Sequence, residues 1–152
     1  MPIVGIISDT HGLLRPEALV PLQGADHIIH AGDIGAAEIV PQLEAIAPVT
    51  AIRGNVDKAA WTRAFPEAVT VELFGKRFFV IHDRGDLVID PATAGYDAVI
   101  SGHSHKPGLE TRDGVLYLNP GSAGRRRFKL PVTVATVLVE GEGMTPAIHE
   151  IG

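Results

Sequence analysis

Residues 3–11 read IVGIISDTH, an apolar run that ends abruptly in polar residues. The run Ile3–Ser8 has no basic flank and is too short for a signal peptide, so we expect it to be a buried strand. Two further apolar runs, Ile28–His30 and Val49–Arg53, follow it, and helical patterns separate the three. Strands that alternate with helices are typical of βαβ units, so this half of the chain predicts a parallel sheet.

The segments between these strands predict two short helices. Pro16–Leu22 starts with a proline, and Gly24 lies just beyond its end, as is common at the two ends of a helix. Ala36–Ile46 also has a helical pattern, although Pro41 must break or restart the helix because proline has no N–H to donate.

The second half of the chain predicts hairpins. The turn Gly75-Lys76 suits a type II′ hairpin, and Asp113-Gly114 and Gly141–Gly143 mark two more. The strands expected here are Val69–Phe74, Arg77–Ile81, Ala98–Ser101, Leu109–Thr111, Val115–Leu118, Val132–Val139 and Ala147–Ile151. We therefore predict an α/β fold of two mixed β-sheets packed together and flanked by helices, forming a single domain over residues 1–152.

Composition excludes several classes of protein. The chain has 152 residues, no cysteine and a formal net charge of −5. Without cysteine there is no disulfide, no cysteine-based zinc site and no thiol nucleophile. The acidic balance argues against a globally basic nucleic-acid binder. No stretch approaches the roughly 18 apolar residues that a membrane span needs, so we expect no membrane partner and a cytoplasmic location.

Polar residues of the kinds that bind metals follow five of the predicted strands. They are Asp9, His11, Asp33, Asn55, His82, His103 and His105. The carboxyl ends of strands in open α/β sheets form one rim, and sites are built there. Gly32, Gly54 and Gly102 precede ligand-type residues and are expected to let the backbone turn sharply. A set of this size at strand ends predicts a metal site rather than solvated loop tips.

The donor set predicts two metal ions. Seven donors are too many for one tetrahedral zinc, but they fit two ions that share a ligand and keep positions open for water and substrate. Imidazole, carboxylate and amide oxygen without thiolate favour Mn, Fe, Zn, Co or Ni over Ca. Two dications with the carboxylates of Asp9 and Asp33 leave a formal charge of about +2. Such a centre attracts phosphate and lowers the pKa of a bridging water.

These residues, in this order, resemble the motifs of the calcineurin-like metallophosphoesterase superfamily. The segments that carry the resemblance are Asp9-Thr10-His11, Gly32-Asp33, Gly54-Asn55-Val56-Asp57, His82 and Gly102-His103-Ser104-His105. Asn119-Pro120-Gly121-Ser122 is similar to the small bacterial and archaeal phosphodiesterase branch in particular. The resemblance implies a four-layer α/β/β/α sandwich. It also implies a phosphodiesterase that hydrolyses small or activated phosphate esters with a hydroxide bridging two metals, for which manganese is the first candidate.

The resemblance also implies how the ligands divide between the metals. One ion would take Asp9, His11, Asp33 and His105, and the other would take Asp33 as the shared ligand, Asn55, His82 and His103. All seven would then be catalytic as well as metal-binding residues. The expected partner is a small phosphate ester. Long nucleic acid is not expected, since aromatic residues for base stacking are few, and the oligomeric state stays open, a homo-oligomer included.

Two departures from the family pattern leave alternatives open. Many family phosphatases have a histidine directly after the motif asparagine, where it protonates the leaving group, whereas this chain has Val56. The general acid is therefore unassigned. Asp83 follows His82 where the family tends to have glycine, and we interpret it as an exposed turn residue in preference to a carboxylate partner of a ligand histidine. A phosphomonoesterase stays an alternative, as does an interaction scaffold with little turnover, such as the retromer subunit of this superfamily.

Three smaller features have two interpretations each. Asp57 is interpreted as the N-cap of a helical segment Lys58–Ala64, in preference to a chemical role. His30 would either orient Asp33 or be a core histidine with its hydrogen bonds satisfied. The basic run Arg125-Arg126-Arg127 would either bind phosphate or form a solvated loop.

Overall fold

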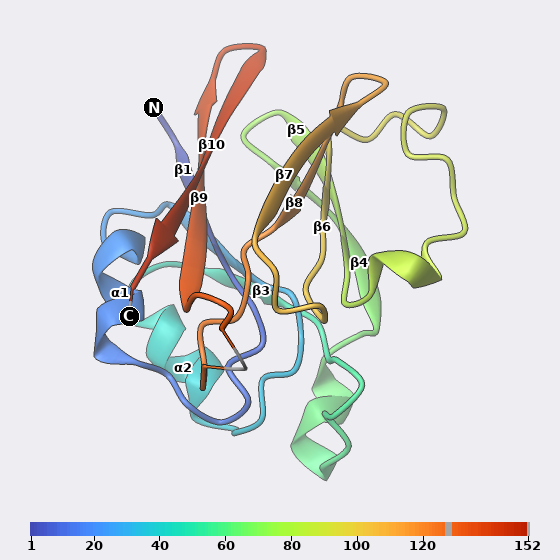
Figure 1. Ribbon diagram of the computed structural model, residues 1–152. Helices are drawn as coiled ribbons and strands as arrows, with labels where there is room; N and C mark the ends of the chain where they lie inside the picture. The colour runs from blue at the N-terminus through green and yellow to red at the C-terminus, as the bar shows by residue number, and fades with distance from the viewer. Residues whose placement is uncertain (127–128, 152) are drawn as a thin grey trace.

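The computed structural model describes residues 1–126 and 129–151, which form two five-stranded sheets packed face to face (Figure 1). In sheet A the order is β10-β9-β1-β2-β3, and in sheet B it is β4-β5-β6-β8-β7. The strands are β1 (Ile3–Ile7), β2 (His27–His30), β3 (Val49–Ala51), β4 (Ala68–Leu73), β5 (Lys76–Ile81), β6 (Ala98–Ile100), β7 (Gly108–Arg112), β8 (Val115–Asn119), β9 (Thr133–Glu140) and β10 (Gly143–Glu150). Arg127, the last of the three arginines in the basic run, lies outside the described residues.

Both sheets mix parallel and antiparallel pairs, as the sequence predicts. Strands β1, β2 and β3 run parallel, and so do β5, β6 and β8. The remaining pairs are antiparallel hairpin neighbours or, for β9, a return strand beside β1. The predicted sandwich of two mixed sheets is confirmed.

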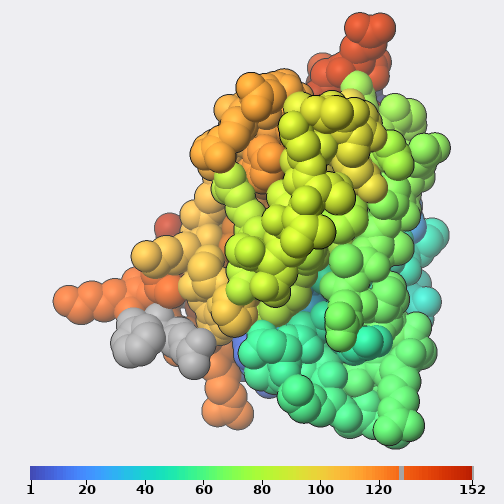
Figure 2. All heavy atoms as spheres, turned by 90° about the vertical axis from the view of Figure 1, so that its right-hand side faces the viewer, coloured from blue at the N-terminus to red at the C-terminus, as the bar shows by residue number. Residues whose placement is uncertain are grey.

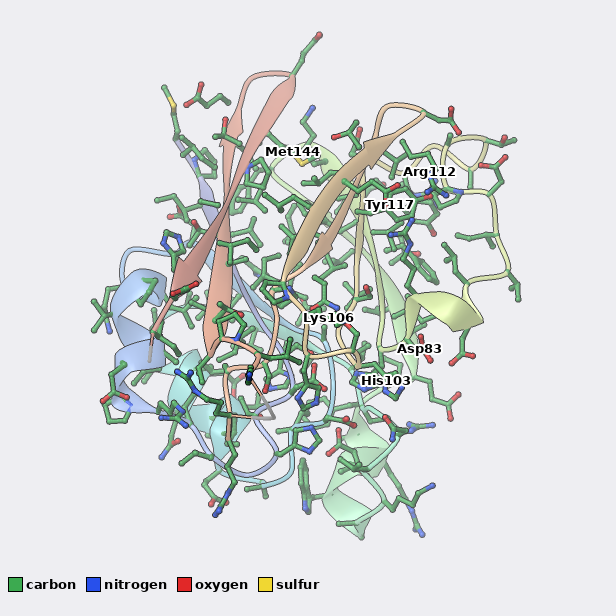
Figure 3. The ribbon with its side chains drawn as sticks, in the orientation of Figure 1. Asp83, His103, Lys106, Arg112, Tyr117 and Met144 are labelled. Carbon is green, nitrogen blue, oxygen red and sulfur yellow. The ribbon has the colours of Figure 1, made fainter. Side chains whose placement is uncertain are left out.

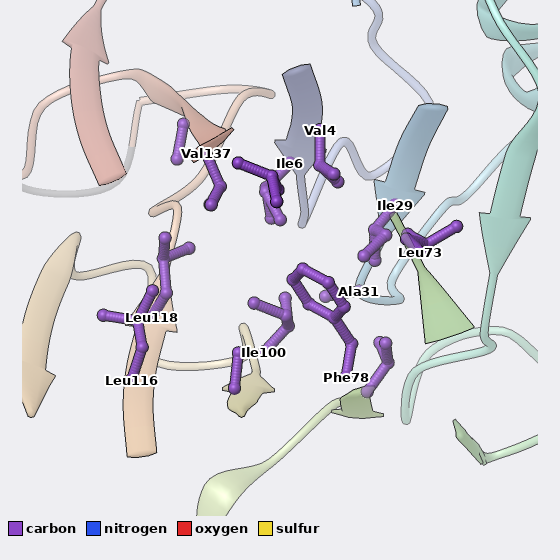
Figure 4. Close-up of a cluster of buried hydrophobic side chains, with 14 of the residues drawn as sticks. Val4, Ile6, Ile29, Ala31, Leu73, Phe78, Ile100, Leu116, Leu118 and Val137 are labelled. Atoms are coloured by element: carbon purple, nitrogen blue, oxygen red, sulfur yellow. The ribbon is translucent and has the colours of Figure 1, made fainter. Parts of the chain in front are cut away.

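Alternation of side chains along the strands divides the core into layers. Val4 and Ile6 of β1 face the space between the sheets, where Phe78 of β5 and Leu118 of β8 meet them (Figure 4). Ile7 of the same strand faces the opposite way, into a second cluster under the helices. This period of two is what a strand buried on both faces requires.

Among the described residues, the two α-helices both pack on sheet A. Helix α1 (Pro16–Leu22) and helix α2 (Ile39–Glu44) pack on its outer face through residues that include Leu22 and Leu43. Over sheet B the outer layer is the segment 83–97, which contains the short 3₁₀ helix η2 (Arg84–Asp86) and buries Leu87 against Val99. Figure 2 shows this segment in yellow-green, lying across the face between green and orange strands.

Several predicted boundaries are corrected by the structure. The helix expected over Ala36–Ile46 is the shorter α2, and Pro41 lies in its first turn, where the missing N–H has no partner to lose. The segment Lys58–Ala64 forms a 3₁₀ helix, η1 (Ala60–Ala64), instead of an α-helix. The turn between β4 and β5 has Phe74 and Gly75 at its centre, both with positive φ of 53° and 82°. Positive φ at both central residues is the property of a type I′ turn, not of the predicted type II′.

Candidate metal centre

Five loops converge at one rim of the sandwich, because parallel strands end at the same edge. Strands β1, β2 and β3 of sheet A and β5 and β6 of sheet B each lead into one of these loops. The loops bring the predicted residues into two groups of potential ligand atoms, each within 4.8 Å of one another. The first, here called the enclosed group, is Asp9, His11 and His105. The second, here called the open group, is Asp33, His82 and His103, to which Asn55 is adjacent.

The enclosed group is centred on one carboxylate oxygen. Asp9 is fully buried, and its Oδ1 lies 3.5 Å from His105 Nε2 and 3.6 Å from His11 Nε2. Its Oδ2 accepts hydrogen bonds from the Ser8 hydroxyl at 2.7 Å and the His103 backbone N–H at 3.0 Å. Because these donors occupy Oδ2, the carboxylate is oriented with Oδ1 towards the imidazoles.

The open group is arranged around His82 and His103. His82 Nδ1 lies 2.7 Å from the carbonyl oxygen of Ala31, which accepts its proton and leaves Nε2 as the potential ligand atom. His82 Nε2 is 3.1 Å from Asp33 Oδ2. The Asn55 side-chain oxygen lies 3.1 Å from His103 Nδ1, so the amide and this imidazole share one location.

Asp33 lies between the two groups. Its Oδ1 accepts a hydrogen bond from the Val56 backbone N–H at 3.1 Å. Its Oδ2 is 3.1 Å from His82 Nε2 in the open group and 3.5 Å from His11 Nε2 in the enclosed group. A single oxygen that faces imidazoles of both groups is the arrangement expected of a shared ligand.

The backbone at these positions is unusual. Among the described residues, the non-glycine residues with positive φ are Asp9, His11, Asp33, His103, His105, Phe74 and Asp113. The last two lie in tight hairpin turns, and the other five belong to the two groups. Left-handed backbone costs a non-glycine residue energy and persists where the surroundings over-determine it, typically at functional sites. The strain is therefore concentrated where ligand atoms are aimed.

The sequence predicts that Gly32, Gly54 and Gly102 allow sharp turns, and the structure corrects this for two of the three. At those two positions the glycine leaves space for a neighbouring side chain instead. Gly32 does have a positive φ of 102°. Gly54 and Gly102 do not, but a Cβ at Gly54 would collide with the side chain of Asp33, and one at Gly102 would collide with Ser8 and Asp9. These glycines let neighbouring loops approach the carboxylates closely.

The segment after β8 braces the loops of both sheets. The Asn119 side-chain amide donates to the Gly102 carbonyl at 3.0 Å and to the Ser104 hydroxyl at 3.1 Å. Ser122 donates its hydroxyl to the backbone oxygen of Asp9 at 3.0 Å. The motif quoted from the sequence thus holds the loop of β6 through its first residue and the loop of β1 through its last. The motif is visible in the sequence, but its role in holding these two loops was not predicted from the sequence.

Asp57 has a different role from the predicted N-cap, since the residue that precedes η1 is Ala59. Its carboxylate is buried and accepts three backbone hydrogen bonds, from Ile34 at 3.0 Å, Gly35 at 3.0 Å and Gly54 at 2.8 Å. These donors belong to the loops after β2 and β3, which carry Asp33 and Asn55. Asp57 therefore fastens one loop of the site to the next.

His30 is a core histidine with its hydrogen bonds satisfied, which decides between its two interpretations. Its Nδ1 accepts from the Gly32 N–H at 3.1 Å, so Nε2 carries the proton and donates to the Thr10 hydroxyl at 3.0 Å. Thr10 in turn donates to the Ile34 carbonyl at 2.8 Å. Burial lowers the pKa of His30 to about 4, against the opposing effect of nearby carboxylates, so the ring is neutral.

Electrostatic coupling ties Asp33 to His82. Burial alone would raise the pKa of Asp33, but hydrogen bonds from His82 and the Val56 N–H lower it to about 2. Burial alone would lower the pKa of His82, but Asp33 and the Ala31 carbonyl raise it to about 9. Without a metal the two side chains form an ion pair, and a bound cation takes the place of the proton.

A cleft of about 500 Å³ opens beside the open group, and Asn55, His82 and His103 form part of its wall. Val56 is 48 % exposed near it and has no proton to donate from its side chain. Asp83 accepts a hydrogen bond from the Gly85 N–H at 2.9 Å, the turn role predicted for it, and its other oxygen lies 3.7 Å from His103 Nε2. In Figure 3 these two side chains lie next to each other.

The described part of the basic run lies beside the enclosed group. Arg15 donates to the Gly124 carbonyl at 2.9 Å, and Gly124 packs directly on the backbone of Thr10. Arg125 and Arg126, which follow, are exposed. Phosphate binding by these arginines stays a prediction, with a solvated loop as the alternative interpretation.

The donors fit divalent metal ions. Asp9 Oδ1 is buried and has no hydrogen-bond partner among the described residues, while imidazole nitrogens lie 3.5 to 3.8 Å from it. Those separations are too long for hydrogen bonds. Ligand atoms about 2.0–2.2 Å from one ion are themselves roughly 3–3.5 Å apart, which is close to this spacing. A buried carboxylate oxygen without a partner is costly, and a cation removes that cost.

Comparison with known proteins agrees with this reading. A sequence model of the calcineurin-like phosphoesterase superfamily domain matches residues 3–142. A probable metallophosphoesterase of Methanothermobacter thermautotrophicus is 33 % identical over 99 % of this chain and 93 % of its own length. The solved structure of an archaeal phosphodiesterase is 25 % identical, with a TM-score of 0.78, and covers 97 % of this chain and 99 % of its own.

A further solved structure shows how widely the fold is used. Vps29 of Chaetomium thermophilum has a TM-score of 0.81 at 16 % identity, covering 99 % of this chain and 86 % of its own, a likeness of fold alone. Over residues 1–126 and 129–151, no helix is both long and apolar enough to cross a bilayer.

Proposed function

This chain belongs to the calcineurin-like phosphoesterase superfamily, and from its rim of donors we propose that it is a metal-dependent phosphodiesterase acting on small or activated phosphate esters. The proposed ligands of one ion are Asp9, His11, Asp33 and His105, and those of the other are Asp33, Asn55, His82 and His103. Manganese is the first candidate, and nickel, iron, zinc and cobalt suit the same donors.

The observation that carries the proposal is the position of Asp33 Oδ2. It lies 3.1 Å from His82 and 3.5 Å from His11, between two groups of donors that come from both sheets. A structural ion pair would need one imidazole, whereas a shared ligand needs both. Two divalent ions held here would supply the Lewis acidity that activates water and stabilises negative charge on phosphate.

The residues of the chain orient the donors and exclude water from part of the site. Ser8 and the His103 N–H fix one oxygen of Asp9, and the Val56 N–H fixes one oxygen of Asp33, so each carboxylate presents the other oxygen. Asp9 is fully buried, which strengthens its interaction with a cation. The cleft beside Asn55 leaves the opposite side accessible to an ester.

The identity of residue 56 favours diesters with good leaving groups over alkyl monoesters. A leaving alkoxide needs a proton, and general acid catalysis typically contributes about 10²–10⁴-fold. Val56 cannot donate one, and His30 is fully buried and neutral, so it does not reach a substrate. Aryl phosphodiesters, whose leaving groups are stable as anions, should therefore be cleaved fastest.

The test is an assay of metal-stripped protein with Mn, Ni, Zn and Mg added back separately. The substrates are an aryl phosphodiester, an aryl phosphomonoester and an alkyl phosphodiester. We expect metal-dependent hydrolysis with kcat/KM highest for the aryl diester and about 10²-fold or more lower for the alkyl diester. Equal rates for aryl and alkyl diesters would assign the proton to another residue, and a faster monoester reaction would favour a phosphomonoesterase. No hydrolysis with any metal would overturn the proposal.

A further inference from the structure

A second cleft, of about 400 Å³, begins where the first one ends. Both are lined by Asp83, and the second continues past Gly102 and Ser104 of the loop that carries His103. In Figure 3 the labels of Lys106 and then Tyr117 lead away from His103 along sheet B. The two clefts meet at Asp83, whose Oδ2 lies 3.7 Å from His103 Nε2, so the second cleft opens beside the open group.

One wall of the second cleft is formed by Arg84. Its Cζ lies 4.2 Å from the ring centre of Tyr117, which is almost completely buried. Arg84 Nη1 also donates to Glu110 Oε2 at 3.0 Å. These two contacts, one with an aromatic ring and one with a carboxylate, restrain the guanidinium group, while 39 % of the side chain stays exposed. The exposed part of this planar group is accessible to a ligand.

The charges of this cleft do not suit a second phosphate. Its charged side chains are Asp83, Arg84, Lys106 and Glu110, two of each sign. Pro107, Leu109 and Leu118 add apolar surface, and Leu109 is 46 % exposed. A neutral overall balance, apolar walls and an exposed guanidinium face together match a flat, uncharged ring, because aromatic rings stack on guanidinium groups.

We propose that the second cleft is a subsite for the planar aromatic ring of a phosphate ester, with Arg84 as the surface on which the ring stacks. This rests on the proposed function, and it narrows the substrate to esters that carry an aryl group or a nucleobase. The role of Arg84 is specificity and not chemistry, since it touches the arm of the ester and not the phosphate.

The test compares two phosphonates that cannot be hydrolysed and differ only in the ring. Binding of phenylphosphonate and methylphosphonate to the manganese-loaded protein is measured by calorimetry. The phenyl compound should bind about two- to fivefold more tightly, the range for a cation–π contact at an exposed site. In Arg84→Ala the ratio of the two dissociation constants should fall to about one. Arg84→Lys keeps the charge without the plane, so its ratio should fall as well.

Arg112 provides the matched control. Its Nη2 donates to the other oxygen of Glu110 at 2.7 Å, but it does not line the second cleft. Arg112→Ala should keep the wild-type ratio, and the affinity for methylphosphonate should stay constant in all variants. An unchanged ratio in Arg84→Ala, or an equal loss in Arg112→Ala, would overturn the subsite. If the protein hydrolyses an aryl diester but binds both phosphonates equally, only the subsite is overturned. If it binds phenylphosphonate more tightly but shows no metal-dependent hydrolysis, only the proposed function is overturned.

Discussion

The enclosed and open groups of the rim use similar donors but differ in what lies beside them. In the enclosed group Asp9 and His105 are buried, and the His11 side chain is 30 % exposed. In the open group Asp33 and His82 are buried, and His103 and the adjacent Asn55 are exposed at the wall of a cleft. Buried ligands are pre-oriented by fixed partners, and exposed ones keep rotational freedom that binding must remove. The difference is one of access, because the cleft is lined by residues of the open group and by none of the enclosed group.

Buried polar residues also connect the loops that carry the two groups. His30 connects the loops of β1 and β2 through Thr10 and Gly32. Asp57 connects the loops of β2 and β3. Both connections include the loop of β2, which carries Asp33, and Asp33 is the residue that lies between the two groups.

Replacing Asp33 should have the largest effect, because it removes the contact between the two groups. Asp33→Asn keeps the shape and the hydrogen bond from Val56 but loses the charge that faces both imidazoles. We expect activity to fall by roughly 10³-fold, more than the 10- to 100-fold typical of outer partners of a metal site. Asn55→Ala should cost about tenfold and leave the metal of the enclosed group in place.

Elemental analysis of the manganese-loaded variants checks this difference. Wild type should hold two ions per chain, Asn55→Ala between one and two, and Asp33→Asn fewer than one. Equal activity and equal metal content in both variants would remove Asp33 from its position between the groups.

The positions of the candidate ligands were predictable because each directly follows an apolar run. A run such as Ile3–Ser8 can only be a strand, and parallel strands must end together, so Asp9 and the residues after the other strands had to meet at one rim. Strand identities were correct for the same reason.

The supports of the site were not predictable from local pattern. The three donors to Asp57 include Ile34 and Gly35, which lie more than 20 residues away in sequence, and an aspartate before a helical segment is most often an N-cap. The close approach that makes Gly54 and Gly102 necessary exists only once two loops are packed together. The outer layer of sheet B has no helical period to detect, since segment 83–97 packs through single residues such as Leu87.

His30, which connects the loops of β1 and β2, should make the stability of the folded protein sensitive to acid. The pKa of His30 is lowered by burial to about 4 in the folded state, from the ordinary histidine value of 6.5, so the unfolded chain takes up a proton first as the pH falls. The contribution of His30 to stability is therefore complete above pH 6.5 and is lost progressively between pH 6.5 and about 4. At pH 5 the expected loss is about 2 kcal/mol, from ~1.4 kcal/mol per pKa unit.

Urea unfolding of metal-free protein at several pH values measures this loss without metal release. The His30→Gln variant should be less stable at pH 7.5, because hydrogen bonds to Thr10 and Gly32 are disturbed, but its stability should depend less on pH between 6.5 and 5. A variant with the same pH dependence as wild type would show that the acid sensitivity originates elsewhere.

Replacing Asp57, which connects the loops of β2 and β3, should weaken metal binding, and this is the smallest effect that we expect in this comparison. Asp57→Asn replaces one of two oxygens that together accept three backbone N–H bonds. The amide N–H₂ then faces either the Gly35 N–H at the Oδ1 position or the Ile34 and Gly54 N–H groups at the Oδ2 position. The loops of Asp33 and Asn55 then lose their fixed spacing, and we expect about tenfold weaker binding of the second manganese ion with the first unaffected.

Asp86→Asn is the matched control, since Asp86 is an exposed carboxylate of the same cleft and makes the same change of charge. If Asp86→Asn weakened the second ion equally, the effect would be the charge of the cleft, and the fastening of one loop to the next would have no part in it. If Asp57→Asn instead weakened the binding of both manganese ions equally, the two groups would behave as one unit. The contrast between the enclosed and the open group would then not extend to the residues that connect their loops.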